Sequence, residues 1–97
     1  MNDNYLSISQ YVDCASNTYD KIIRYNNLID ALELKIIKSI GQSGYVEMNF
    51  DDGQMKVKST YRSIQDMESG LLALEKQRQR YINRYNGRSR NLRGGNL

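Results

Sequence analysis

The chain has 97 residues, 39% of them hydrophobic, and a formal net charge of +3, with one cysteine, no histidine and no proline. This length fits one small domain, and a single cysteine excludes an intramolecular disulfide and a zinc site built on cysteines. No apolar run approaches the roughly 20 residues that cross a bilayer, and no signal-peptide pattern opens the chain, so we expect a soluble protein from an intracellular pool, without membrane contact.

Residues 1–16 are the hardest part of the chain to interpret. Their apolar side chains fit neither the helical period nor the period of two that marks a strand. These side chains are Tyr5, Leu6, Ile8, Tyr11 and Val12. Two interpretations stay open: the segment is an arm that orders against a neighbouring molecule, or it extends the following helix backwards.

The first clear helix is predicted from residue 17 or 18 to residue 40. Asn17 is a good N-cap, and Asp20 in the first turn suits the positive end of the helix dipole. Apolar residues recur at steps of three and four along one face, and Ile23 and Ile37 widen it. This face comprises Ile22, Tyr25, Ile29, Leu32, Ile36 and Ile40. It forms either part of the core or a seam for a partner helix.

A β-hairpin is predicted from two alternating segments, residues 45–50 and 54–60. Asp52 and Gly53 lie between them, and Asp-Gly is a strong turn signal because Gly adopts positive φ without steric cost. The alternation gives one polar face toward solvent and one apolar face. The apolar face comprises Val46, Met48, Phe50, Met55 and Val57. Because a lone hairpin is marginal in water, we expect the helices to cover this face.

The second helix is predicted to open at Ser63 and to stop at residues 86–87. The Ser63 hydroxyl is placed to cap the backbone N–H of Asp66, whose carboxylate suits the positive helix end. Gly70 lies inside this helix and either marks a close approach to another element or is a tolerated flaw. One helix face continues through Ile64, Met67, Leu71, Leu74, Arg78, Tyr81, Ile82 and Tyr85.

Together these elements predict an α+β domain over residues 17–87, in which two antiparallel helices pack with one β-hairpin. Residues 1–16 form a separate N-terminal segment under either interpretation. Residues 88–97 have no core-forming content, so they are predicted to be a flexible tail rich in Arg and Gly.

The charge of the chain changes sign near residue 75. Residues 1–75 hold 7 basic and all 11 acidic residues, a net charge of −4, whereas residues 76–97 hold 7 basic residues and no acid, a net charge of +7. Such a change marks a separate functional surface. Its candidate partner-binding residues are Arg78, Arg80, Tyr81, Arg84, Tyr85, Arg88 and Arg90.

Three interpretations of this basic surface stay open. Arginine offers a forked donor and a stacking plane, which suit phosphates, carboxylates and aromatic faces. The surface binds the backbone of nucleic acid without reading its sequence, or it docks on an acidic surface of a protein. The third interpretation is a solvated helix end with charges favourable to the helix dipole.

Catalysis is poorly supported by the residue types. Histidine, the commonest general acid or base, is absent, and Cys14 therefore has no imidazole to activate it. Asp51 and Asp52 are explained by turn chemistry, and the sequence contains neither a phosphate-binding glycine loop nor a metal-ligand cluster. We therefore expect neither an enzyme nor a protein with a cofactor or metal.

The hairpin turn, the second strand and the start of the second helix resemble the phage lambda gpW family of head–tail joining proteins, also called head completion proteins. Asp52 and Gly53 carry the resemblance together with the strand QMKVKST at residues 54–60 and the helix SIQDMESGLLALE at residues 63–75. An Arg-rich tail containing glycine follows, as in the family. The longer N-terminal segment and the extension of the second helix beyond residue 75 depart from the family pattern.

The resemblance implies a fold of two antiparallel helices and one hairpin, and a structural virion protein at the head–tail interface that is assembled in the host cytoplasm. It implies a ring, of twelve copies, that binds the portal protein, closes the DNA-filled head and presents a platform for tail or further adaptor proteins, with packaged DNA nearby. The tail is needed for joining in the family, and this role would fall here on Arg88, Arg90, Leu92 and Arg93. The alternative function is a small, non-catalytic DNA-binding module that acts through the basic helix and tail.

Overall fold

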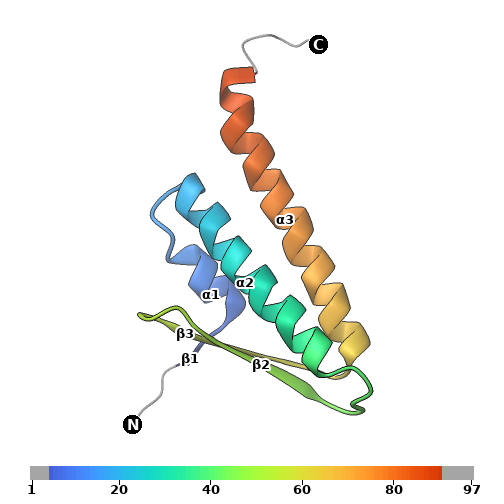
Figure 1. Cartoon of the computed structure of the whole chain (residues 1–97). Helices are drawn as coiled ribbons and strands as arrows, with labels where there is room; N and C mark the ends of the chain where they lie inside the picture. Colours follow the sequence, from blue (N-terminus) through green and yellow to red (C-terminus); the bar gives the residue numbers. More distant parts are fainter. Residues whose placement is uncertain (1–4, 91–97) are drawn as a thin grey trace.

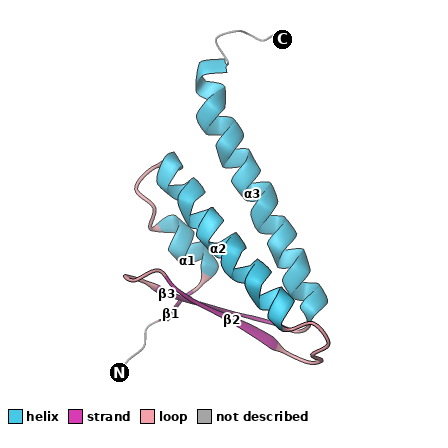
Figure 2. Cartoon of the chain, in the orientation of Figure 1, coloured by secondary structure: helices cyan, strands magenta, loops and turns pink. Residues whose placement is uncertain are grey.

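Three helices and a three-stranded mixed sheet form the fold in the computed structural model, which describes residues 5–90 and the side chains of residues 5–87. The elements follow in the order β1 (Tyr5–Leu6), α1 (Ile8–Asp13), α2 (Thr18–Lys38), β2 (Val46–Asp51), β3 (Lys56–Tyr61) and α3 (Ile64–Arg90). The long helices α2 and α3 pack side by side in opposite directions, and the sheet lies against them (Figures 1 and 2). The predicted α+β class is therefore confirmed.

The N-terminal segment adds a strand that the sequence did not predict. β1 pairs in parallel with β3, with Tyr5 opposite Lys56 and Leu6 opposite Val57. β2 pairs with β3 in the antiparallel sense, as predicted for the hairpin, so that β3 is the central strand in the order β1-β3-β2.

A separate short helix, α1, follows this strand. It begins with a reciprocal cap, in which the Ser7 hydroxyl accepts from the Gln10 N–H and the Gln10 side chain accepts from the Ser7 N–H. It ends at Asp13, before α2 begins at Thr18. Over the described residues the segment is therefore neither an arm nor an extension of α2. Two residues of strand and six of helix are too few for a hydrophobic period to show.

The core lies between the helices and the inner face of the sheet. The hairpin supplies its predicted apolar face, with Val46, Met48 and Val57 buried and Phe50 and Met55 half-buried. The other buried apolar residues come from all three helices: Tyr11, Val12, Tyr25, Leu28, Ile29, Leu32, Met67 and Leu74. The prediction that one face of α2 belongs to the core is confirmed for its central residues.

Three isoleucines that the sequence assigned to this face of α2 lie outside the core. Ile23 and Ile37 keep 38% and 65% of their surface exposed, because they point away from the sheet and from α3. Leu28 is buried instead, although the predicted face omitted it. Ile40 is 74% exposed because α2 ends at Lys38, so the chain has left the helical path there.

The start of α3 agrees with the prediction. The N–H of Asp66 donates to the Ser63 hydroxyl at 3.1 Å. Gly70 marks a close approach to β3, because a Cβ added there would lie 3.0 Å from the Tyr61 ring.

The predicted end of α3 is wrong. The helix passes through residues 86 and 87 and continues to Arg90, so the predicted tail begins later than residue 88. A lone glycine in a helix costs only about 1 kcal/mol relative to alanine, which is too little to stop a helix by itself. The rest of the predicted tail, residues 91–97, lies outside the described residues.

Tyr11 joins α1 to α2 and to the hairpin turn. Its side chain is fully buried, and its hydroxyl donates to Asp52 Oδ2 at 3.0 Å and accepts from Asn27 Nδ2 at 3.2 Å. The Arg24 guanidinium lies 4.9 Å from the centre of the Tyr11 ring and donates to the Tyr11 backbone oxygen at 3.0 Å. Burial, above all, raises the pKa of Tyr11.

Asp52 organises the turn from the other side of this contact. Its Oδ1 accepts from the backbone N–H groups of Gln54, at 2.9 Å, and Met55, at 2.8 Å, while Gly53 takes a φ of 97°. Desolvation raises the pKa of Asp52, but these two N–H groups, the Tyr11 hydroxyl and Arg24 outweigh it, so the pKa lies below its ordinary value of 3.8.

Tyr11→Phe should lower the free energy of unfolding by about 1–2 kcal/mol, because it removes a buried hydroxyl with two hydrogen-bond partners. Urea denaturation monitored by circular dichroism would measure the change. Tyr45→Phe is the matched control, since the Tyr45 ring is 71% exposed. Equal stability of the two variants would contradict the role of the Tyr11 hydroxyl.

Asp52→Asn should make the free energy of unfolding depend less steeply on pH in the acid range. The pKa of Asp52 is lower in the folded chain than its ordinary value of 3.8, so its ionisation stabilises the fold above that pH. This contribution is lost as the pH falls below 3.8 and through the folded pKa. We expect the free energy of unfolding, measured in urea from about pH 5.5 to about pH 2.5, to fall more steeply in the wild type than in the variant. Parallel profiles would exclude this role.

Candidate partner-binding end of the helix pair

The second half of α3 lies beside the first turns of α2, because the two helices are antiparallel (Figure 1). We call this region, residues 17–25 together with residues 76–87, the basic end. From residue 76 onward α3 carries no carboxylate. Lys76, Arg80 and Arg84 are exposed there, so this end of the domain presents a positive surface.

Four tyrosines pair across the two helices at the basic end. Tyr25 and Tyr81 stack, with ring centres 5.7 Å apart and planes 24° from parallel. Tyr19 and Tyr85 form a second pair, nearer the start of α2 and the end of α3, with ring centres 5.8 Å apart and planes at 39°. The inner pair is mostly covered, whereas Tyr19 and Tyr85 keep 56% and 51% of their surface exposed. The inner pair therefore holds the helices together, and the outer pair offers aromatic surface.

Cations flank the inner pair. Lys21 Nζ and the Arg84 guanidinium each lie 4.9 Å from the centre of the Tyr81 ring, within the range of a favourable cation–π contact. Burial, first of all, raises the pKa of Tyr25; Tyr81 and Asp13 act in the same direction, and Arg80 opposes them. The Tyr25 phenol therefore stays neutral, and the positive charge of this end comes from the surrounding lysine and arginines.

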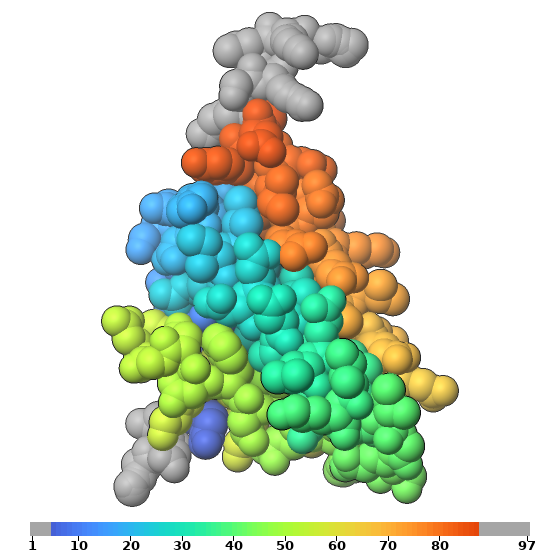
Figure 3. Space-filling view, in the orientation of Figure 1, coloured from blue at the N-terminus to red at the C-terminus, as the bar shows by residue number. Residues whose placement is uncertain are grey.

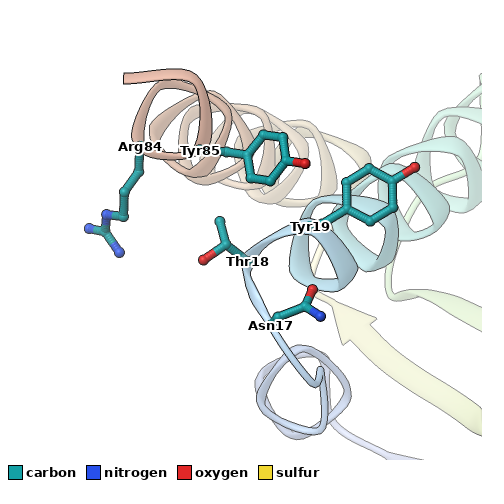
Figure 4. Close-up of a pocket in the computed structure, with 5 residues that line it drawn as sticks. All are labelled: Asn17, Thr18, Tyr19, Arg84 and Tyr85. Atoms are coloured by element: carbon teal, nitrogen blue, oxygen red, sulfur yellow. The ribbon is translucent and has the colours of Figure 1, made fainter. Parts of the chain in front are cut away.

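A hollow of about 420 Å³ opens between the outer tyrosines and the start of α2, lined by Asn17, Thr18, Tyr19, Arg84 and Tyr85. Figure 4 shows Tyr19 and Tyr85 next to each other on one side and Arg84 on the other. No carboxylate of the described residues lines the hollow. Within the described residues, the Arg84 guanidinium stacks on a ring but donates no hydrogen bond, so its N–H groups are available to an acceptor on a partner.

Arg78 lies between α3 and α2, unlike the exposed Arg80 and Arg84. Its Nη1 donates to Asn26 Oδ1 at 2.9 Å, and its Nε is buried without a hydrogen-bond partner among the described residues. Arg78 therefore joins α3 to α2, as Tyr81 does by stacking. Both were predicted as partner-binding residues, and their surroundings are instead intramolecular.

The structure thus brings together part of the predicted set. Arg80, Arg84 and Tyr85 share the surface of the basic end. The backbone of α3 includes Arg88 and Arg90, but the structure does not describe their side chains. Leu92 and Arg93 lie outside the described residues altogether. Asp52, Gly53, Ser63 and Asp66 hold the turn and the helix cap.

Sequence reasoning missed the contribution of α2 to this surface. Asn17 was read as a helix cap, and Tyr19 and Lys21 were not singled out. The signal was available: two antiparallel helices joined by a hairpin must bring the first turns of one beside the last turns of the other.

Among the described residues, no group of three or more His, Cys, Asp or Glu side chains is placed to hold a metal ion. No helix in that part of the chain is long and apolar enough to cross a membrane. Comparison with protein-family models, with curated proteins and with solved structures gives no match. The chemistry of the surface itself must therefore indicate the function.

Arg78→Ala should destabilise the domain by about 1–2 kcal/mol, because it removes a hydrogen bond between the helices and the packing of the side-chain stem. Arg80→Ala, two residues along the same helix and exposed, should change stability by less than about 0.5 kcal/mol. Thermal and urea unfolding of both variants would measure the difference. An Arg78→Ala protein as stable as the Arg80→Ala protein would show that Arg78 is not a structural link.

Proposed function

We propose that this protein is a structural head-to-tail connector subunit of a phage virion. In this proposal the subunits bind as a ring to the portal, close the DNA-filled head and provide the attachment platform for the tail. The resemblance of residues 52–75 to the head completion family supports it, and so does the arrangement of two antiparallel helices around a hairpin.

The observation that carries the proposal is the basic end of the helix pair. Tyrosine and arginine are the residue types enriched in the energetic centres of protein interfaces. Here two half-exposed tyrosines, Tyr19 and Tyr85, border a hollow with an arginine that donates no hydrogen bond to the described residues. Such a site fits a partner that inserts an apolar or planar side chain beside a carboxylate.

The position of this site suits an adaptor. Arg80 and Arg84 lie on the half of α3 that runs beside the first turns of α2, and this end of the helix pair points away from the sheet (Figure 1). A partner can therefore engage the basic end without touching the core or the hairpin. The first half of α3, which carries Asp66, Glu68 and Glu75, remains for other contacts.

Non-specific binding to duplex DNA is the second candidate function. It is favoured by the succession of Lys76, Arg80 and Arg84, which repeats at one-turn steps along α3 with no carboxylate after Glu75. Phosphates along a duplex attract such a row without any reading of the bases.

Arg84→Glu should weaken binding to the cognate portal ring about tenfold or more, because it would place a negative charge against the carboxylate that this proposal assigns to the portal. Biolayer interferometry with immobilised portal rings would measure the affinity. Arg62→Glu is the matched control, since Arg62 is exposed just before the start of α3, beside Asp66, and undergoes the same charge change. Equal affinity of both variants, or no binding by the wild type, would reject the connector function.

A DNA titration separates the two candidates. If the wild-type chain ignores the portal and binds duplex DNA, with log K falling against log salt by about 0.9 per phosphate contacted, the second function replaces the first. If Arg84→Glu leaves DNA affinity unchanged, the second function is rejected as well.

A further inference from the structure

An exposed stripe runs along the face of α2 that is turned away from the core. Leu34 and Ile37 keep 54% and 65% of their surface exposed, and Ile23 keeps 38%. Asp30 lies on the same stripe, because residues 23, 30, 34 and 37 recur at the steps that hold one face of a helix. In Figure 3, α2 lies open at the surface, in cyan to green. Apolar residues gathered in this way mark a contact surface.

A second stripe lies on the outer face of α3. Leu72 is 61% exposed, and Lys76 and Arg80 follow it at one-turn steps, both exposed. This face is turned away from α2, since Met67 and Leu74, on the opposite side of α3, are buried. The described residues therefore leave this stripe uncovered.

The two stripes match when they run in opposite directions. Asp30 precedes Leu34 by four residues, and Lys76 follows Leu72 by four, so each pair spans about 6 Å of helix axis. An antiparallel contact that places Leu34 on Leu72 therefore places Asp30 opposite Lys76. In the same register Ile37 lies opposite Ser69, so the two leucines supply the apolar part of the contact.

The charges of the two stripes are available for this contact. No ion pair joins Asp30 or Lys76 to another residue in the described part of the chain. Glu33 adds a second exposed negative charge beside Asp30, and Arg80 adds a positive charge beyond Lys76. The contact thus pairs one exposed leucine with another and, one turn away, a negative charge with a positive charge.

We propose that a second copy of this chain covers the α2 stripe with its own α3 stripe, antiparallel, through Leu34 with Leu72 and Asp30 with Lys76. Two different faces meet, so each copy offers one stripe to each of two neighbours, and the contact repeats into a closed ring or an open filament. The inference rests on the proposed connector function and deepens it by naming where neighbouring subunits meet. It leaves Arg84 and the hollow free for the portal.

A charge-reversal cycle tests this contact. Asp30→Lys and Lys76→Asp would be made singly and together, and association of the purified chains would be followed by analytical ultracentrifugation up to about 1 mM. Each single reversal places like charges opposite each other and should weaken association about tenfold, whereas the double reversal should return to within about threefold of the wild type. Both residues are exposed, and circular dichroism would verify that every variant is folded.

Two further variants sharpen the test. Leu72→Ser removes the apolar contact without opening the core and should also weaken association about tenfold. Thr60→Lys, on the exposed outer face of the sheet, adds a positive charge away from both stripes and should have no effect.

Two results would overturn the proposed contact: a wild-type chain that stays monomeric over the whole concentration range, or an association that ignores both single reversals. Portal binding is measured separately through Arg84→Glu. If association is lost but portal binding is intact, this contact is rejected and the connector function stays in place. If portal binding is lost but association is intact, the connector function is rejected and this contact stays in place.

Discussion

The buried hydroxyl of Tyr11 is the constraint on which the arrangement of the domain depends. A phenol removed from water must find hydrogen-bond partners or lose stability. Tyr11 finds them on two other elements, Asn27 of α2 and Asp52 of the hairpin turn. Since the Asp52 carboxylate also holds the turn through backbone N–H groups, the position of α1 and the shape of the turn are set together. An N-terminal helix of six residues is in this way part of the core.

The antiparallel pair of α2 and α3 divides the aromatic residues into two roles. Tyr25 and Tyr81 are covered and stacked, with cations from both helices around Tyr81, so they hold the helices together. Tyr19 and Tyr85 repeat the arrangement further out, where less of the domain covers them. The same residue type therefore holds the helices together where they are packed closely and leaves aromatic surface exposed where they end. Tyrosine suits both, because its ring packs and its polar tip tolerates water.

The elements with long periods or strong turn chemistry could be predicted from the sequence. The hairpin face, the Asp-Gly turn and the Ser63 cap follow from local rules, and the core face of α2 follows from its period. Ile23 and Ile37 could not be assigned, because a helix that is apolar on more than one side does not reveal which side is buried. The contacts of Tyr11 and Arg78 depend on partners 41 and 52 residues away along the chain, which no local pattern encodes. The basic surface was visible as a run of charges, but its α2 half was visible only after the two helices were placed side by side.

The outer faces of the long helices are poorly explained by the stability of the single domain. Lys76, Arg80 and Arg84 follow one another at steps of four residues on α3, a spacing at which like charges repel and destabilise a helix. Carboxylates at alternate positions would relieve this repulsion, yet none follows Glu75. On α2 the corresponding face leaves Leu34 and Ile37 in water, where their burial would contribute about 25 cal/mol per Å². Both costs disappear if acidic and apolar surfaces of other molecules cover these helices. The proposed connector accounts for both features at once, because its subunits are covered by a neighbouring subunit and by the portal.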